Sequence, residues 1–467
     1  MNHMTDASRD SMEKRIREIM EDTCARGLAA AVIDKDGNTL YQNFFGYKDA
    51  EEKSNIDEDT LFGLASVTKS FTALSIMQMA KAGILSLYDP ISKYIPEFTN
   101  KNQSEPVRIW HLLCHSGGFF PLPRIVVHDV VNEMGIKDTL EQELIYNTAF
   151  AERGVRLVAE RLDNQKNLIG KPGEFMSYCN DGYGLLSDII RRYSDCDSYA
   201  KYLERHILQP LGMDRSHISF IRSTLDKNAA TLYTLENGTW RHDKDFMNDA
   251  FVLNGGGAMK STLADLKKYL AMYLNEGTGL NGAEIADEYC IREMYKPRQY
   301  EKPGVWYGFG LETKMLRDMQ IHQHGGSLPG VSSNIAFSEE AGIAVIVLCN
   351  TMDVPVSAIS DLIFKTVAGL PTEDQRPEHA VYDWDEDFKR RIVGTYASGE
   401  GDTIKLSLES GRIAMTVNDK PTDMIPVYPR EGLVRKTYSD MYLQFIETKE
   451  RGVYAARYGS RIFPKTA

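Results

Sequence analysis

The segment Phe62-Gly63-Leu64-Ala65-Ser66-Val67-Thr68-Lys69-Ser70-Phe71 opens a mostly apolar run that continues to Gly83. The pattern predicts a helix whose first turn carries Ser66 and, three residues on, Lys69, so that the two side chains share one face. Because apolar residues lie on nearly every side beyond Lys69, we expect this helix in the interior of a domain. Gly83 is a residue type that commonly ends a helix.

Ser66 and Lys69 together suggest nucleophilic chemistry. A serine hydroxyl is a poor nucleophile until a base takes its proton, and a lysine can be that base if burial lowers its pKa. Backbone N–H groups at the start of a helix can also stabilise an oxyanion. The S-x-x-K spacing alone is weak evidence, because it recurs at Ser11 and Ser198 in charged segments.

The composition of the 467 residues is that of a globular protein, with 42% apolar and 26% charged residues. A net charge of -12 without clustered Lys or Arg argues against a nucleic-acid partner. Six cysteines without a C-x-x-C pair predict reduced thiols. Residues 1–21 lack an apolar signal-peptide core, and no apolar run is long enough to span a bilayer, so we expect a cytoplasmic protein without a membrane partner.

A mixed pattern of helix and strand signals predicts an α+β domain over residues 1–370. A charge-rich segment over residues 121–170 is expected to form a helical lobe near the site. The expected strands lie at residues 28–33, 39–45, 333–337 and 343–348, and the expected helices at residues 8–26, 109–113, 182–193, 263–275 and 354–368.

The C-terminal part of the chain has a different pattern. A polar, proline-flanked linker is predicted over residues 371–388. Over residues 389–467, short alternating runs are separated by Gly, Asn or Asp, which predicts a small all-β barrel or sandwich domain.

Three short motifs follow in a fixed order: Ser66-x-x-Lys69, Tyr178-x-Asn180 and His324-Gly325-Gly326. Their order and spacing resemble the serine β-lactamase and penicillin-binding-protein superfamily, and most closely its class C-like branch of esterases, D-aminopeptidases and related peptidases. Each motif is common by itself, whereas the ordered set is specific. The flanks that also match are Leu112-Leu113-x-His115-Ser116-Gly117-Gly118, Pro172-Gly173-x-Phe175, Gly182-Tyr183-x-Leu185-Leu186 and Pro210-Leu211-Gly212-Met213.

The resemblance implies a β-lactamase/DD-peptidase-like fold, an antiparallel sheet flanked by helices with a helical lobe, followed by a lipocalin-like or small barrel domain. It also implies residue roles. Ser66 would be acylated, Lys69 would accept its proton, and Tyr178 would pass a proton to the leaving group. Asn180 would orient Lys69 or the substrate. The oxyanion hole would combine the N–H of Ser66 with that of Ser327, which follows Gly325 and Gly326 on an edge of the cleft.

The chain departs from the β-lactamase pattern at His324-Gly325-Gly326, where those enzymes have Lys-Thr-Gly. The missing ammonium and hydroxyl groups hold a β-lactam or D-Ala-D-Ala carboxylate, so the esterase and aminopeptidase branch fits better. His324 could supply electrostatic help or a proton, because the ordinary pKa of histidine lies near neutrality.

We therefore expect a serine hydrolase that forms a Ser66 acyl-enzyme with small esters or peptides, including peptides with a D-residue. A non-hydrolytic ligand sensor or scaffold on the same fold is one alternative, and a true β-lactamase or DD-carboxypeptidase is another. No cofactor is expected, and no metal, because His111 and His115 have no companion carboxylate at metal-ligand spacing. The sequence leaves a homo-oligomer open. The structural alternatives are an N-cap role for Ser66, a core role for Tyr178 and a turn role for Asn180.

Overall fold

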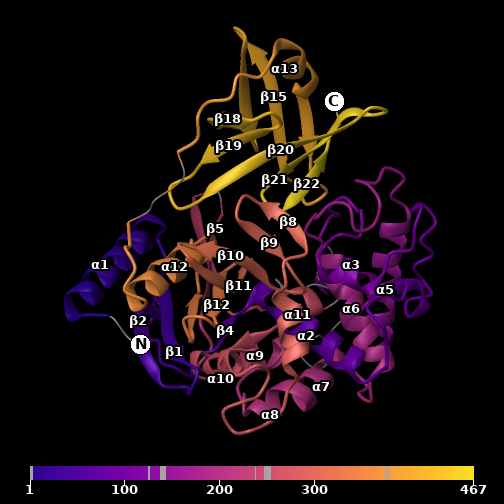
Figure 1. The fold of residues 1–467 in the computed structure, drawn as a ribbon. Coiled ribbons are helices and arrows are strands. Elements are labelled where there is room, and N and C mark those ends of the chain that lie inside the picture. The colour runs from indigo at the N-terminus through magenta and orange to yellow at the C-terminus, as the bar shows by residue number, and fades with distance from the viewer. Residues whose placement is uncertain are drawn as a thin grey trace.

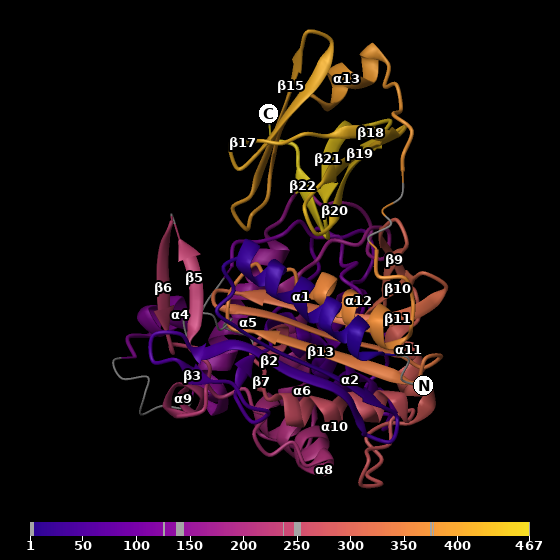
Figure 2. The same ribbon diagram turned by 90° about the vertical axis from the view of Figure 1, so that its left-hand side faces the viewer.

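A nine-stranded antiparallel sheet forms the centre of the computed structural model, which describes residues 4–124, 127–136, 144–236, 238–246, 254–373, 376 and 378–466. The strand order is β3-β2-β1-β13-β12-β11-β10-β9-β8 (Figures 1 and 2). The strands are β1 (Gly27–Asp34), β2 (Thr39–Asp49), β3 (Ser54–Asn55), β8 (Gln299–Lys302), β9 (Val305–Tyr307), β10 (Glu312–Leu316), β11 (Met319–Leu328), β12 (Val331–Ser338) and β13 (Ile343–Cys349).

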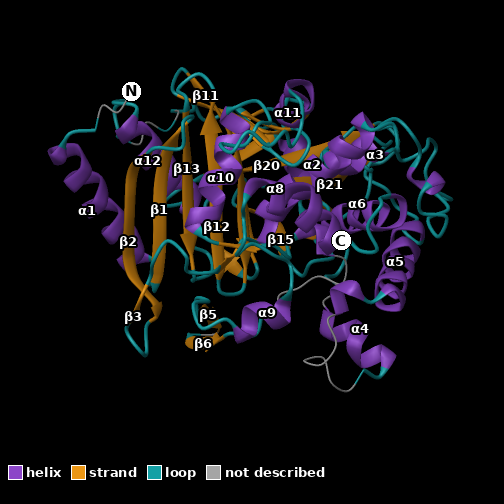
Figure 3. Cartoon of the chain, turned by 90° about the horizontal axis from the view of Figure 1, so that it is seen from below, coloured by secondary structure: helices purple, strands orange, loops and turns teal. Residues whose placement is uncertain are grey.

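Helices cover both faces of this sheet (Figure 3). Strand β1 shows the reason, because the side chains of its residues 28–33 are all apolar and enter two different cores in alternation. Leu28, Ala30 and Val32 pack with α1 (Asp6–Asp22) and α12 (Val356–Val367) on one face. Ala29, Ala31 and Ile33 pack on the other face with α2 (Thr68–Lys81) and α10 (Leu263–Leu274).

A helical lobe lies beside α2 and continues the second core (Figure 1). Its helices are α3 (Ile109–Leu113), α4 (Val127–Met134), α5 (Thr148–Asp163), α6 (Asn180–Tyr193), α7 (Tyr199–Leu203), α8 (Gln209–Leu211) and α9 (Phe220–Leu225), and α11 (Glu288–Tyr295) packs against α2. Two short ribbons complete this part, β4 (Phe62–Gly63) with β7 (Lys260–Ser261) and β5 (Leu232–Glu236) with β6 (Thr239–Asp243). Among the described residues, every helix is too short or too polar to cross a membrane.

The C-terminal residues form two further antiparallel sheets above the central sheet (Figures 1 and 2). One contains β14 (Gly394–Ala397), β15 (Thr403–Glu409), β16 (Arg412–Val417) and β17 (Lys420–Pro421). The other contains β18 (Ile425–Tyr428), β19 (Glu431–Arg435), β20 (Asp440–Thr448), β21 (Gly452–Tyr458) and β22 (Arg461–Pro464). Helix α13 (Glu386–Ile392) contributes Phe388 and Ile392 to their shared core. Closure into a barrel and the domain boundaries stay predictions.

The predicted fold class, α+β with a β-lactamase/DD-peptidase-like sheet and helices, is confirmed. Two details of the expected elements are wrong. Ser66 lies in a 3-10 turn (Ala65–Val67) that precedes α2 rather than in the helix itself, and α6 begins at Asn180 rather than at residue 182. Parts of the expected lobe (residues 125–126 and 137–143) and of the expected linker (residues 374, 375 and 377) lie outside the described residues.

Candidate active site

The buried amine of Lys69 is the centre of the site. Its Nζ lies 3.2 Å from Ser66 Oγ, 2.7 Å from Asn180 Oδ1 and 2.6 Å from the backbone oxygen of Gly256. Asn180 Oδ1 and the Gly256 carbonyl are acceptors only, so they take two Nζ hydrogens. A neutral amine has only two hydrogens, which leaves its lone pair directed at the Ser66 hydroxyl. This geometry suits a base that takes the Ser66 proton.

The electrostatics of the site favour that neutral amine. Lys69 is fully buried, and burial is the main reason that its pKa lies well below the ordinary value; the positive charge of Arg461 lowers it further. The turn before α2 is also unusual, because Ala65 has a left-handed φ of 46°. The N-cap residue of α2 is Val67 and that of the preceding 3-10 turn is Leu64, so Ser66 occupies neither position, which disfavours the N-cap role.

Tyr178 lies against the same amine. Lys69 Nζ is 4.7 Å from the centre of the Tyr178 ring, and the phenol and the Ser66 hydroxyl lie within hydrogen-bonding reach of each other. Burial raises the pKa of Tyr178, and the bond with Ser66 and the charge of Arg461 only partly offset this. Tyr178 therefore remains protonated at neutral pH and can donate a proton to a departing group.

The C-terminal sheets reach this site through the turn between β21 and β22. The N–H of Tyr178 donates to the Ser460 carbonyl at 2.8 Å, and the N–H of Ile462 donates to Ser177 Oγ at 3.1 Å. The Arg461 guanidinium lies 4.9 Å from the centre of the Tyr178 ring and forms an ion pair with Glu400. The C-terminal residues are therefore part of the walls of the site.

His324 lies near Tyr178, with ring centres 6.4 Å apart, but its chemistry differs from the expectation. Its Nδ1 lies 2.6 Å from the Gly325 carbonyl and must donate, so Nε2 accepts from the Tyr307 hydroxyl at 2.9 Å. Burial lowers the pKa of His324 to about 4. The expected near-neutral pKa is wrong, and both ring nitrogens are occupied, so His324 is poorly suited to give a proton at pH 7. An electrostatic role for it stays a prediction.

At Gly326, strand β11 packs closely against the turn that carries Ser66. A Cβ built on Gly326 would lie 2.2 Å from the Leu64 carbonyl and 3.0 Å from the Ser66 nitrogen, so only glycine fits there. Ser327 follows it and is exposed, and Gly325 is partly exposed. This closeness of strand and turn is what an oxyanion hole formed by the Ser66 and Ser327 N–H groups requires, although the use of those N–H groups stays a prediction.

Several contacts of the site were not predicted from the sequence. The Gly256 carbonyl comes from a glycine-rich turn (Asn254–Gly256), which the sequence shows only as a bend. Tyr183, whose ring centre is 5.5 Å from Lys69 Nζ, and Tyr307 read as ordinary core residues. The available signals are indirect: Tyr183 belongs to a flank that matches the family pattern, and it lies on the first turn of the helix that Asn180 begins.

A possible metal-ligand set occurs elsewhere. Asp195, Cys196 and His206 place one ligand atom each within 4.8 Å of one another, a set that the sequence did not indicate. Asp195 already binds Arg205 at 2.8 Å and His206 at 3.0 Å. A cationic neighbour opposes metal binding, so this set is better explained as an ion-pair cluster.

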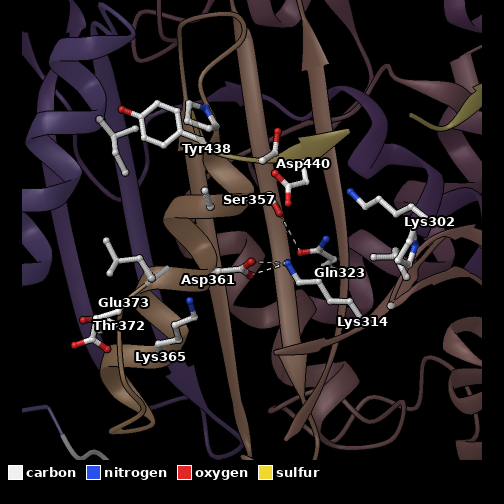
Figure 4. Close-up of a pocket in the computed structure, with 18 of the residues that line it drawn as sticks. Lys302, Lys314, Gln323, Ser357, Asp361, Lys365, Thr372, Glu373, Tyr438 and Asp440 are labelled. Atoms are coloured by element: carbon white, nitrogen blue, oxygen red, sulfur yellow. Dashed lines mark hydrogen bonds and ion pairs between the residues drawn. The ribbon is translucent and has the colours of Figure 1, made fainter. Parts of the chain in front are cut away.

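A cavity of 1240 Å³ lies on the other face of the central sheet (Figure 4). It is bounded by α1, α12, the β10–β11 strands and the C-terminal residues around Tyr438 and Asp440, and Lys314 pairs with Asp361 across part of it. Gln323 lines this cavity, whereas the next residue along β11, His324, contacts Tyr307 on the opposite face. None of the predicted site residues lines it.

A Beta-lactamase family model matches residues 12–369, so the chain belongs to the β-lactamase family. Protein flp of Staphylococcus aureus is 28% identical over 349 residues, which cover 72% of this chain but only 63% of flp. The octameric penicillin-binding protein homologue from Pyrococcus abyssi is 26% identical, with a TM-score of 0.68 over 98% of this chain and 100% of that one. SurE, solved with D-Leu, is 19% identical with a TM-score of 0.71 over 99% and 100% of the two chains, and shows the fold alone.

The chain therefore combines a β-lactamase-family fold with a serine hydroxyl beside a buried lysine amine. The contacts of Lys69 bring Ser66 and Asn180 together, and Tyr178 lies beside them as the motifs predict.

Proposed function

We propose that the protein is a serine hydrolase that forms a covalent acyl-enzyme on Ser66 with small esters or peptides, including peptides with a D-residue. The observation that carries the proposal is the set of hydrogen-bond partners of Lys69 Nζ, which are Asn180 Oδ1, the Gly256 carbonyl and the Ser66 hydroxyl. Two fixed acceptors orient the lone pair toward the nucleophile, which is the arrangement that a neutral lysine base needs.

The acylation step uses these groups in sequence. Lys69 takes the Ser66 proton while Ser66 Oγ adds to the substrate carbonyl carbon, and the oxyanion is held by the N–H groups of Ser66 and Ser327. The tetrahedral intermediate then collapses, and its bond to the leaving group breaks. Tyr178 gives the leaving group a proton and regains one from protonated Lys69. Water repeats the sequence to release the acid and restore the free Ser66 hydroxyl.

The substrate class is narrowed by two features. His324 stands where β-lactamases have lysine, and the Arg461 turn lies over Tyr178, which restricts the room beside the nucleophile. Both favour small esters and short peptides over a β-lactam. The D-Leu present with the SurE structure supports D-amino-acid esters and amides as the first probes.

Other functions remain as alternatives. A sensor or scaffold would be acylated once without turnover, whereas a β-lactamase or DD-carboxypeptidase would hydrolyse a cephalosporin or a D-Ala-D-Ala peptide faster than simple esters. The complete set of Ser66, Lys69 and Tyr178 favours turnover. The octameric state of the Pyrococcus abyssi homologue also supports a homo-oligomer for this chain, which light scattering would measure.

Hydrolysis of a p-nitrophenyl acetate ester tests the proposal. We expect steady turnover by the wild type and a loss of at least about 10⁴-fold in Ser66→Ala, because the nucleophile is removed. Ser11→Ala is the matched control, since Ser11 begins another S-x-x-K sequence on α1 and should leave the rate unchanged. Equal rates in Ser66→Ala and the wild type would contradict the proposal. D- and L-leucine p-nitroanilides then compare the two stereoisomers.

Arg461→Gln tests the electrostatic contribution of the C-terminal residues. Arg461 lowers the pKa of Lys69, so its removal should raise that pKa and move the acid limb of the pH profile of kcat/KM to higher pH. Arg451→Gln is the control, because that arginine stacks on Tyr454, 3.6 Å from its ring centre, and binds the Leu168 carbonyl instead. An acid limb that stays in place in Arg461→Gln would show that the charge does not act on Lys69.

A further inference from the structure

The loop that carries Tyr178 is held by three consecutive backbone N–H groups. Ser177 N–H donates to the carbonyl of His115 at 2.9 Å, and Cys179 N–H donates to Nδ1 of the same histidine at 3.1 Å. Between them, Tyr178 N–H donates to the Ser460 carbonyl at 2.8 Å. His115 therefore binds the residue on each side of Tyr178, while the C-terminal turn binds Tyr178 itself.

The ring of His115 is fixed as well as buried. Since Nδ1 accepts a hydrogen bond, the proton of the neutral ring must be on Nε2, which has no hydrogen-bond partner among the described residues. The ring lies 4.1 Å from that of Tyr178, 4.7 Å from that of Tyr307 and 5.0 Å from that of Tyr183, measured between centres. Burial keeps the pKa of His115 well below its usual range. The ring is therefore neutral at pH 7, and its Nδ1 stays an acceptor for the Cys179 N–H.

We propose that His115 is a positioning residue for the reaction: its carbonyl and its Nδ1 hold the Tyr178 loop so that the phenol stays in contact with Ser66. The inference rests on the proposed function, in which Tyr178 gives its proton to the leaving group. A displacement of about 1 Å in such a group can lower a rate by about 10²-fold. The two hydrogen bonds on either side of Tyr178 resist such a displacement.

The geometry of His115 selects the variants that test this role. His115 has a left-handed φ of 56°, which asparagine tolerates better than most residues. The Oδ1 atom of asparagine lies where Nδ1 of histidine lies, so His115→Asn keeps an acceptor for Cys179 N–H. Glutamine is closer to histidine in size but carries its amide one bond further out. His115→Gln is therefore the matched variant that loses the acceptor position.

The experiment compares ester hydrolysis and amide hydrogen exchange in the wild type, His115→Asn and His115→Gln. We expect kcat to fall about 10²-fold in His115→Gln with KM changed less than about threefold, and His115→Asn to stay within about fivefold of the wild type. The amides of residues 177–179 should exchange faster in His115→Gln alone. A purely structural role would instead lower the melting temperature of both variants without separating them in kcat.

Each outcome is decisive. Equal kcat in His115→Gln and the wild type, or equal impairment of the two variants, would overturn the positioning role. If the wild type itself hydrolyses no ester, the proposed function fails, and hydrogen exchange then decides whether His115 holds the loop. In that case, amide exchange at residues 177–179 that is the same in His115→Gln and in the wild type would show that His115 does not hold the loop.

Discussion

Replacement of Lys69 by methionine is expected to lower kcat for ester hydrolysis by at least about 10³-fold, because the Ser66 proton loses its acceptor. Methionine has a similar length and suits the buried position, so the protein should remain folded. The loss should appear in kcat and kcat/KM alike, since Lys69 acts on the reacting hydroxyl and not on substrate binding. Stopped-flow release of p-nitrophenol measures both constants.

Lys81→Met is the control for that substitution. Lys81 ends the same helix but is exposed and pairs with Asp287, so its loss should leave the kinetics unchanged. If Lys69→Met keeps wild-type kcat while its melting temperature is normal, Lys69 is not the base. In that case, another group would have to accept the Ser66 proton.

Gly326→Ala is expected to lower kcat by about 10²–10³-fold, the usual cost of losing an oxyanion donor. A methyl group there would lie 2.2 Å from the Leu64 carbonyl and 3.0 Å from the Ser66 nitrogen, so the turn that presents Ser66 or strand β11 must move. Either movement separates the two N–H groups that would hold the oxyanion. The same overlap should lower the melting temperature.

Gly325→Ala is the matched control on the neighbouring residue. Its Cβ would meet nothing closer than 3.8 Å, so we expect kcat to fall less than about tenfold and the melting temperature to stay close to that of the wild type. Wild-type activity in Gly326→Ala would show that the strand yields without disturbing Ser66. The close approach would then have no catalytic importance.

Much of the site could be predicted from the sequence because its main groups lie in short, local patterns. Ser66 and Lys69 are three residues apart, so a single turn brings their side chains to one face, and Tyr178 and Asn180 belong to one short motif two residues apart. Strand β1 was predictable for a similar reason, since its run of apolar residues suits a strand buried on both faces.

The remaining features depend on contacts between distant segments. Lys69 binds a backbone oxygen of Gly256, 187 residues away, and a carbonyl group carries no sequence signature. The hydrogen bond from the Tyr178 N–H to the Ser460 carbonyl could not be predicted for the same reason, because its acceptor is also a backbone oxygen. The pKa of His324 depends on burial beneath Tyr307, and strands β8 to β10, which bring Tyr307 there, are short and partly polar. Local periodicity does not reveal such strands.

Intact mass spectrometry of the enzyme, quenched in acid during p-nitrophenyl acetate turnover and followed by peptide mapping, tests the central claim most directly. The account predicts one acyl group per chain, located on Ser66 in the wild type and absent from Ser66→Ala. An acyl group on any other residue, or the same adduct in Ser66→Ala, would contradict it.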